Sequence, residues 1–330
     1  MPKIDPRLSI APMMNWTDRH CRVFHRLLSK KTLLYSEMIT SGAIINGNRD
    51  QLLRFNEIEH PVALQIGGSN PWEVSEASKI GIDFGYDEIN LNLGCPSDRV
   101  QSGCFGATLM KEPKLVFDCL SRMKKEVKNA KITVKCRLGV DDQDPEVTLP
   151  AFLEYLISAG VDGIIIHARK ALLKGLTPKQ NRDIPNLDYE LVIEMKKRFP
   201  QTEIVINGGI NNLTEANRFL NDGLDGVMIG RAAYYNPHHI LLLADKEIFE
   251  KELVNTTMKD VLSQFCEYIE RELERGTRLN KMTRHILGAF NGVSGSRHFR
   301  RILSQNAHRP GADISVVKEA IDKVCHNRYW

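Results

Sequence analysis

Short apolar segments recur along the first two thirds of the chain, and most are followed by a stretch with helical spacing. The apolar segments are four to six residues long, which is typical of buried strands bounded by turns. They predict eight strands, over Leu8–Ala11, Leu33–Glu37, Val62–Ile66, Glu88–Leu93, Ile132–Arg137, Gly163–Ala168, Glu203–Asn207 and Gly226–Gly230. Helices are predicted between most of them, for example over Lys114–Val127, Leu149–Ala159, Tyr189–Phe199 and Leu213–Asp222.

Alternating strands and helices favour parallel pairing with right-handed crossovers. Eight such units in about 240 residues match a (β/α)8 barrel. A doubly wound open sheet is the alternative, but it would need a glycine-rich dinucleotide fingerprint after the first strand, and Ala11–Trp16 is not one. No P-loop pattern is present either. We therefore predict an α/β fold built on a TIM barrel.

Strand signals stop after about Leu242, and helical patterns continue to the end of the chain. One apolar stripe is formed by Met258, Val261, Leu262, Phe265, Ile269 and Leu273. Further helices are expected over Lys281–Phe290, His298–Gln305 and Ile314–Asn327. The prediction is two domains: a barrel over residues 1–245 and a small all-helical C-terminal domain over residues 246–330.

Composition narrows the class of protein. The hydrophobic fraction of 42% and charged fraction of 26% are ordinary for a globular protein. The N-terminus has no apolar core of the signal-peptide kind, and runs such as Gly163–Ile166 are too short to cross a bilayer, so no membrane association is expected. The seven cysteines are odd in number and lack Cys-x-x-Cys spacing, which argues against disulfides and zinc and favours the cytoplasm.

Positive charge is concentrated in two places. From Arg275 to Ala312 there is no acidic residue but there are eight lysines or arginines. A second run, from Arg169 to Arg182, contains five basic residues and no acid. Either run alone is explained by a solvated helix face; together they indicate a polyanionic partner.

The stretch from Asn90 to Met110 is the best candidate for chemistry. The predicted strand stops at Gly94, and Pro96 removes a backbone donor, so Cys95 is placed on a turn just past a strand end. Reactive side chains are often presented on loops in this way. Taken alone, the cysteine is better explained as a buried residue in a tight turn.

The carboxyl ends of the other strands carry further polar groups. Asn207-Gly208-Gly209 after strand seven and Gly230-Arg231 after strand eight expose backbone N–H groups at the two loops where barrels bind phosphate. Lys135 is expected to point into the barrel, where a buried lysine needs a negative partner, either a structural carboxylate or an anionic cofactor ring. The Gln65 amide suits a ring edge with adjacent C=O and N–H groups, and His167 is a candidate contact beside the phosphate loop. These groups suggest bound flavin mononucleotide, with a nicotinamide visiting only briefly.

The sequence resembles the tRNA-dihydrouridine synthase family over nearly its whole length. The most specific match is Leu91-Asn92-Leu93-Gly94-Cys95-Pro96, and the strings over 175–185 and 291–297 resemble the A-type subfamily. This resemblance implies FMN-dependent reduction of uridine in the D-loop of tRNA, with NADPH as reductant, by a cytoplasmic and metal-free monomer. It implies Cys95 as the active-site acid. Residues implied in FMN binding are Pro12, Met13, Met14, Gln65, Lys135, His167, Asn207, Gly208, Gly209, Gly230 and Arg231. Those implied in tRNA binding are Asn92, Lys179, Arg182, Arg297 and Arg300.

The chemistry agrees with that expectation. Reducing the C5–C6 bond of uracil needs a hydride at C6 and a proton at C5, and a protonated thiol opposite the flavin is a suitable donor. The uridine must also leave the tRNA fold, and contacts from the basic runs would offset that cost. Two alternatives stay open: an FMN barrel that reduces a free pyrimidine or other small molecule, and a non-catalytic tRNA-binding chaperone.

Overall fold

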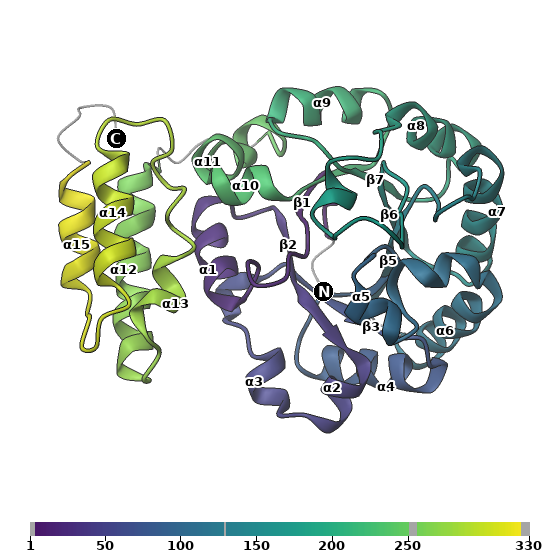
Figure 1. Cartoon of the computed structure of the whole chain (residues 1–330), viewed down its shortest axis with the longest axis horizontal. Coiled ribbons are helices and arrows are strands. Elements are labelled where there is room, and N and C mark those ends of the chain that lie inside the picture. Colours follow the sequence, from purple (N-terminus) through teal and green to yellow (C-terminus); the bar gives the residue numbers. More distant parts are fainter. Residues whose placement is uncertain (1–3, 129, 251–255, 325–330) are drawn as a thin grey trace.

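The structure, a computed structural model, describes residues 4–128, 130–250 and 256–324. Eight parallel strands pair in sequence order and close into a barrel, with β8 hydrogen-bonded to β1 (Figure 1). The strands are β1 (Leu8–Ile10), β2 (Leu33–Thr40), β3 (Val62–Gly67), β4 (Glu88–Asn92), β5 (Lys131–Arg137), β6 (Gly163–His167), β7 (Ile204–Asn207) and β8 (Gly226–Ile229). All eight predicted strands are present, and the predicted (β/α)8 fold is confirmed.

Helices surround the barrel and return the chain from each strand to the next (Figure 1). Many begin at the residue types that favour a helix start: the Asn70 side chain accepts from the Trp72 and Glu73 N–H groups, and Pro113 and Pro145 open two other helices. In the described parts of the chain, no helix combines the length and the apolar character needed to span a bilayer. The barrel-region helices are α1 (Arg19–Leu28), α2 (Ser41–Asn46), α3 (Arg49–Leu53), α4 (Pro71–Asp83), α5 (Asp98–Ser102), α6 (Pro113–Glu126), α7 (Pro145–Ser158), α8 (Tyr189–Arg198), α9 (Leu213–Asn221), α10 (Arg231–Tyr235) and α11 (Pro237–Glu247).

The inside of the barrel is closed below the strand ends by apolar side chains and one polar cluster. Ala63, Ile165 and Val205 pack there as part of a small core cluster. Beside them, Glu88 accepts hydrogen bonds from the Tyr35 and Thr133 hydroxyls, and burial raises the pKa of its carboxyl. These side chains fill the barrel at this level, and a cavity lies near the carboxyl ends of the strands.

The C-terminal part is helical, as predicted, and lies beside the barrel next to α1 (Figure 1). It comprises α12 (Met258–Glu274), α13 (Leu279–Thr283), α14 (Ser296–Asn306) and α15 (Ser315–Asp322). The prediction of a helix over Lys281–Phe290 is wrong, because α13 ends at Thr283 and turns follow it. Ile286, Ala289 and Phe290 in these turns are nevertheless buried. The final residues of the helix predicted over Ile314–Asn327 lie outside the described residues. A domain boundary near residue 245 stays a prediction.

The junction between the two parts combines apolar and polar contacts. Phe24 on α1 packs against Phe265 on α12, with ring centroids 5.3 Å apart. His20 is bonded to the Tyr268 hydroxyl at 2.7 Å, and Arg19 forms an ion pair with buried Glu272. The first two turns of α1 are therefore tied to α12.

Candidate active site

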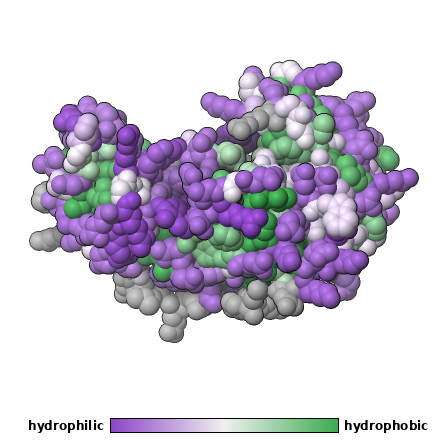
Figure 2. Space-filling view, turned by 90° about the horizontal axis from the view of Figure 1, so that it is seen from below, coloured by the Kyte–Doolittle hydropathy of each residue, from purple (hydrophilic) through white to green (hydrophobic). Residues whose placement is uncertain are grey.

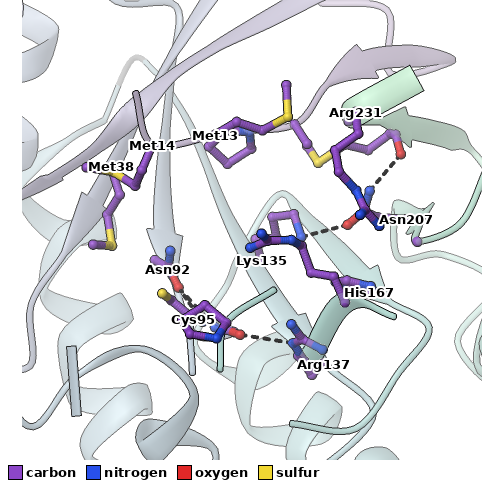
Figure 3. Close-up of a pocket in the computed structure, with 18 of the residues that line it drawn as sticks. Met13, Met14, Met38, Asn92, Cys95, Lys135, Arg137, His167, Asn207 and Arg231 are labelled. Atoms are coloured by element: carbon purple, nitrogen blue, oxygen red, sulfur yellow. Dashed lines mark hydrogen bonds between the residues drawn. The ribbon is translucent and has the colours of Figure 1, made fainter. Parts of the chain in front are cut away.

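A cavity of about 500 Å³ opens at the carboxyl ends of the strands, and every one of the eight strands or the loop after it contributes to its lining. Figure 3 shows Cys95 and Asn92 at one side of this pocket and Asn207 and Arg231 at the other, with Lys135 between them. Fourteen of the residues predicted from the sequence line it: Pro12, Met13, Met14, Gln65, Asn92, Cys95, Lys135, His167, Arg182, Asn207, Gly208, Gly209, Gly230 and Arg231.

The Cys95 loop is held from below by Asn92. The Asn92 Oδ1 accepts hydrogen bonds of 3.0 Å from the backbone N–H groups of both Gly94 and Cys95. Gly106 closes the loop with φ +71°, and a Cβ on that residue would lie only 2.6 Å from the Cys95 carbonyl oxygen. The thiol is partly exposed, and its Sγ lies 3.4 Å from the Ser97 hydroxyl. The turn predicted from Gly94 and Pro96 thus presents a free thiol to the pocket.

A row of amides continues inward from Asn92. The Asn92 Nδ2 donates to Gln65 Oε1 at 2.9 Å, and the Gln65 Nε2 donates to Asn90 Oδ1 at 2.8 Å. All three side chains are buried. The row fixes which end of the Gln65 amide is the donor, while each end keeps the capacity for one more hydrogen bond to a ligand.

Lys135 enters the pocket without an acidic partner. Its Nζ donates to Asn207 Oδ1 at 2.8 Å, and among the described residues no carboxylate pairs with it. Burial, with the nearby positive charge of Arg137, lowers the pKa of Lys135 to about 7. The structural ion pair considered from the sequence is therefore not formed in the described structure, and an anionic ligand would stabilise the charged ammonium.

His167 and the glycine pair after β7 form one wall. Burial and neighbouring cations hold the pKa of His167 well below its usual value, so the ring is neutral and offers one donor and one acceptor. Gly208 has φ +114°, and a Cβ there would lie 2.6 Å from the His167 ring. The Tyr189 hydroxyl donates to the Gly208 carbonyl oxygen at 2.7 Å. This close approach explains why the wall is made of glycine backbone.

Arg231 is paired at the rim of the pocket, and three of the predicted tRNA-binding residues lie outside its lining. Arg231 forms a 2.7 Å ion pair with Asp183, so its guanidinium already has an anionic partner at the rim. Lys179 is exposed just before Arg182, outside the pocket lining. Arg297 and Arg300 lie on α14, away from the pocket, and no described residue pairs with either side chain.

Twelve further residues line the cavity without having been predicted as site residues, and Arg137 and Met38 are two of them. Arg137 donates to the Gly94 carbonyl at 3.1 Å and to the Asn181 carbonyl at 2.8 Å, so it joins the Cys95 loop to the loop after β6. Arg137 follows Lys135 by two residues in the same strand, so the sequence already indicated that both side chains point to the same face. Met38 reaches the pocket because the β2 and β3 pairing shifts register between Tyr35 and Met38, and no sequence pattern marks that shift.

A second cavity, of about 330 Å³, lies in the C-terminal helices. Lys281, Arg284 and His308 contribute to its lining. It belongs to the acid-free region identified in the sequence. No group of three or more histidines, cysteines or acids is arranged to bind a metal ion within the part of the chain that the structure describes.

The chain is similar to proteins of one family along most of its length. Residues 9–325 match the family described as dihydrouridine synthase. The sequence is 52% identical over 319 residues to the tRNA-dihydrouridine(20/20a) synthase of Vibrio cholerae, covering 96% of each chain. It is 51% identical over 323 residues to the protein of the same name from Escherichia coli K12, covering 98% of this chain and 92% of that protein.

Solved structures with low sequence identity share the fold. The old yellow enzyme from Trypanosoma cruzi superposes with a TM-score of 0.55 at 11% identity, covering 77% of this chain and 91% of that one. At that identity the likeness shows the fold alone.

Proposed function

Because the chain belongs to the dihydrouridine synthase family, we propose that it reduces the C5–C6 double bond of uridine in the tRNA D-loop, at the positions that the names of its relatives give as 20 and 20a. The observation that carries this proposal is the placement of a free thiol, Cys95, and an unpaired ammonium, Lys135, in one open pocket. A proton donor and a cation are the two groups that a flavin-dependent reduction of uracil requires from the protein.

FMN is the cofactor that suits the pocket. No carboxylate among the described residues pairs with Lys135, and the anionic ring of a reduced flavin would supply the missing negative charge. The Gln65 amide retains one donor and one acceptor for the edge of the ring, and the neutral His167 beside Gly208 can contact the phosphate. Bound FMN, reduced by NADPH, would supply the hydride that reaches C6 of the uracil.

Cys95 supplies the proton in this proposal. The thiol S–H bond breaks as a C–H bond forms at C5, which leaves a thiolate that regains its proton from solvent. Asn92 holds the backbone of the loop through two hydrogen bonds, so the sulfur has a fixed position. The Ser97 hydroxyl, 3.4 Å from the sulfur, can relay the returning proton, giving its own proton to the thiolate as it accepts one from water. Arg137 supports the same loop through the Gly94 carbonyl.

The tRNA would contact both parts of the molecule. Figure 2 shows a hollow between the C-terminal helices and the barrel, and hydrophilic residues cover much of the surface around it. Arg297 and Arg300 are free to bind phosphate because no described carboxylate neutralises them. Arg182 at the pocket rim and the nearby Lys179 extend the basic surface to the barrel. We also propose that the enzyme acts on tRNA in the cytoplasm and that it does so as a monomer.

The test is a reduction assay with purified protein. The protein should be yellow, its absorbance should bleach with NADPH, and unmodified tRNA should restore it while dihydrouridine appears. Free uridine, tested in parallel, should restore it far more slowly. Equal rates with free uridine would favour the small-molecule reductase, whereas tRNA binding without dihydrouridine would favour the chaperone.

A further inference from the structure

An aromatic cluster of Trp16, Tyr234 and Tyr235 stands at the mouth of the pocket, and none of the three was predicted to bind the cofactor or the tRNA. Trp16 lines the pocket and stacks on Tyr234, with centroids 4.6 Å apart and planes inclined by 19°. Tyr235 meets Trp16 edge-on at 5.2 Å. Tyr235 is 50% exposed and Met14, which also lines the pocket, is 55% exposed. Large apolar side chains left open beside a binding pocket indicate a contact surface.

The cluster is held rigidly by both parts of the molecule. The Asn15 carbonyl accepts a 2.8 Å hydrogen bond from Arg284, and the Asn15 N–H donates to Glu37 on β2. The Trp16 N–H donates to the Met13 carbonyl at 3.0 Å, which closes the turn between them. Tyr234 is fixed through its hydroxyl, which donates to the Arg284 carbonyl. A ring presented in this way loses little conformational entropy on binding.

We propose that Trp16 and Tyr235 form a stacking platform for the nucleotide base next to the target uridine. This inference rests on the proposed tRNA substrate. Extruding one uridine unstacks its neighbours, and an unstacked base is the group that aromatic side chains recognise in RNA. Two cations lie near the cluster and could meet the phosphates of a nucleotide. Arg182 lines the same pocket as Trp16, and Arg284 donates to the Asn15 carbonyl.

The experiment measures dissociation constants of holoenzyme variants with three tRNAs. One tRNA is unmodified, and the others carry an abasic site immediately 5′ or 3′ of the target uridine. Tyr235→Ala should weaken binding of the unmodified tRNA roughly 5- to 150-fold, the range for losing one base–aromatic stack. Tyr235→Phe, which keeps the ring, should bind like the parent. Tyr155→Ala is the matched control, because Tyr155 is a partly exposed tyrosine on α7, outside the pocket lining.

The decisive measurement is the coupling between the Tyr235→Ala substitution in the protein and the abasic site in the tRNA. If a base stacks on Tyr235, one of the two abasic tRNAs should bind the parent protein more weakly than the unmodified tRNA does. Tyr235→Ala should then weaken the binding of that abasic tRNA little further. The proposal would be overturned if the affinity losses from the substitution and from the abasic site multiplied for both abasic tRNAs. It would also be overturned if Tyr235→Ala bound tRNA as tightly as Tyr155→Ala does. NADPH should reduce the flavin of all variants at the parent rate. A parent protein that forms no dihydrouridine would refute the proposed function instead, so the two failures are distinguishable.

Discussion

Lys135 on β5 donates a 2.8 Å hydrogen bond to the Oδ1 of Asn207 on β7, across the intervening strand β6. Asn207 is itself oriented by a 2.8 Å hydrogen bond from its Nδ2 to the Met228 carbonyl. An amide positions the ammonium but does not neutralise it. The pocket therefore holds an amine whose charged form an anionic ligand would stabilise, and this arrangement makes the stability of the protein depend on pH.

Changing Lys135 to Met should alter how stability depends on pH in the cofactor-free protein. The pKa of Lys135 falls from 10.5 unfolded to about 7 folded, so between pH 7 and 10.5 the unfolded chain binds more protons. This group therefore makes the free energy of unfolding rise with pH across that window, and its destabilising effect is complete below pH 7. Thermal unfolding from pH 6 to 10 should show that Lys135→Met removes this contribution. A constant difference from the parent would contradict it. The variant should also bind FMN more weakly.

Removing the thiol should stop proton transfer without releasing the cofactor. We expect Cys95→Ala to lower the single-turnover rate with tRNA by about 10²- to 10⁴-fold, the usual contribution of a general acid. The flavin spectrum should be unchanged. Cys104→Ala is the matched control, because Cys104 is an exposed thiol nearby that does not line the pocket. If both variants react at the parent rate, Cys95 is not the donor.

Charge on α14 should govern the salt dependence of tRNA binding. The double change of Arg297 and Arg300 to Ala should weaken binding and reduce the slope of log K against log salt by about one for each phosphate that α14 no longer binds. Arg198→Ala is a suitable control, because Arg198 is an exposed cation on the barrel paired with Glu154. Flavin absorbance should stay unchanged in each. Identical slopes for the double variant and the control would show that α14 does not contact phosphate.

Gly208→Ala should damage the pocket more than a positive φ alone explains. Gly208 and Gly175 both have positive φ, +114° and +82°, but only at Gly208 would a Cβ meet another group, the His167 ring at 2.6 Å. Gly175→Ala should cost about 1 kcal/mol of strain, with full flavin content. Gly208→Ala should cost more and lose flavin, as measured by unfolding and by absorbance. Equal flavin content in the two variants would count against the close packing of His167 on this turn.

Much of the fold was predictable because most strands are short and largely apolar and are followed by turn residues. The Cys95 turn was predictable for the same local reason, since Gly94 and Pro96 end the strand. The helix predicted over Lys281–Phe290 failed because burial of Ile286 and Phe290 is achieved by successive turns, which helical spacing cannot distinguish from a helix.

Contacts across the barrel were less accessible to sequence reasoning. The row from Asn92 through Gln65 to Asn90 joins two strands, and its register depends on how those strands pair. The partner of Lys135 was likewise open, because the pairing of strands brings Asn207 to it from 72 residues away. Residue type and strand position identified several of these side chains as candidates for the site. Which of them form hydrogen bonds with one another depends on how the strands pair in the closed barrel.

The polar contacts that α1 and the loop before it make with the C-terminal part restrict which C-terminal segments this barrel can accept. Tyr268 and Glu272 meet His20 and Arg19, while His285 bonds to Asp18 at 3.0 Å, a few residues after the loop that carries Trp16. A foreign C-terminal segment grafted onto this barrel would leave those groups mismatched unless α1 were transplanted with it. The helical appendage and the first barrel helix should therefore be inherited as one unit, and a chimera joined near residue 245 should fail where one that also exchanges α1 succeeds.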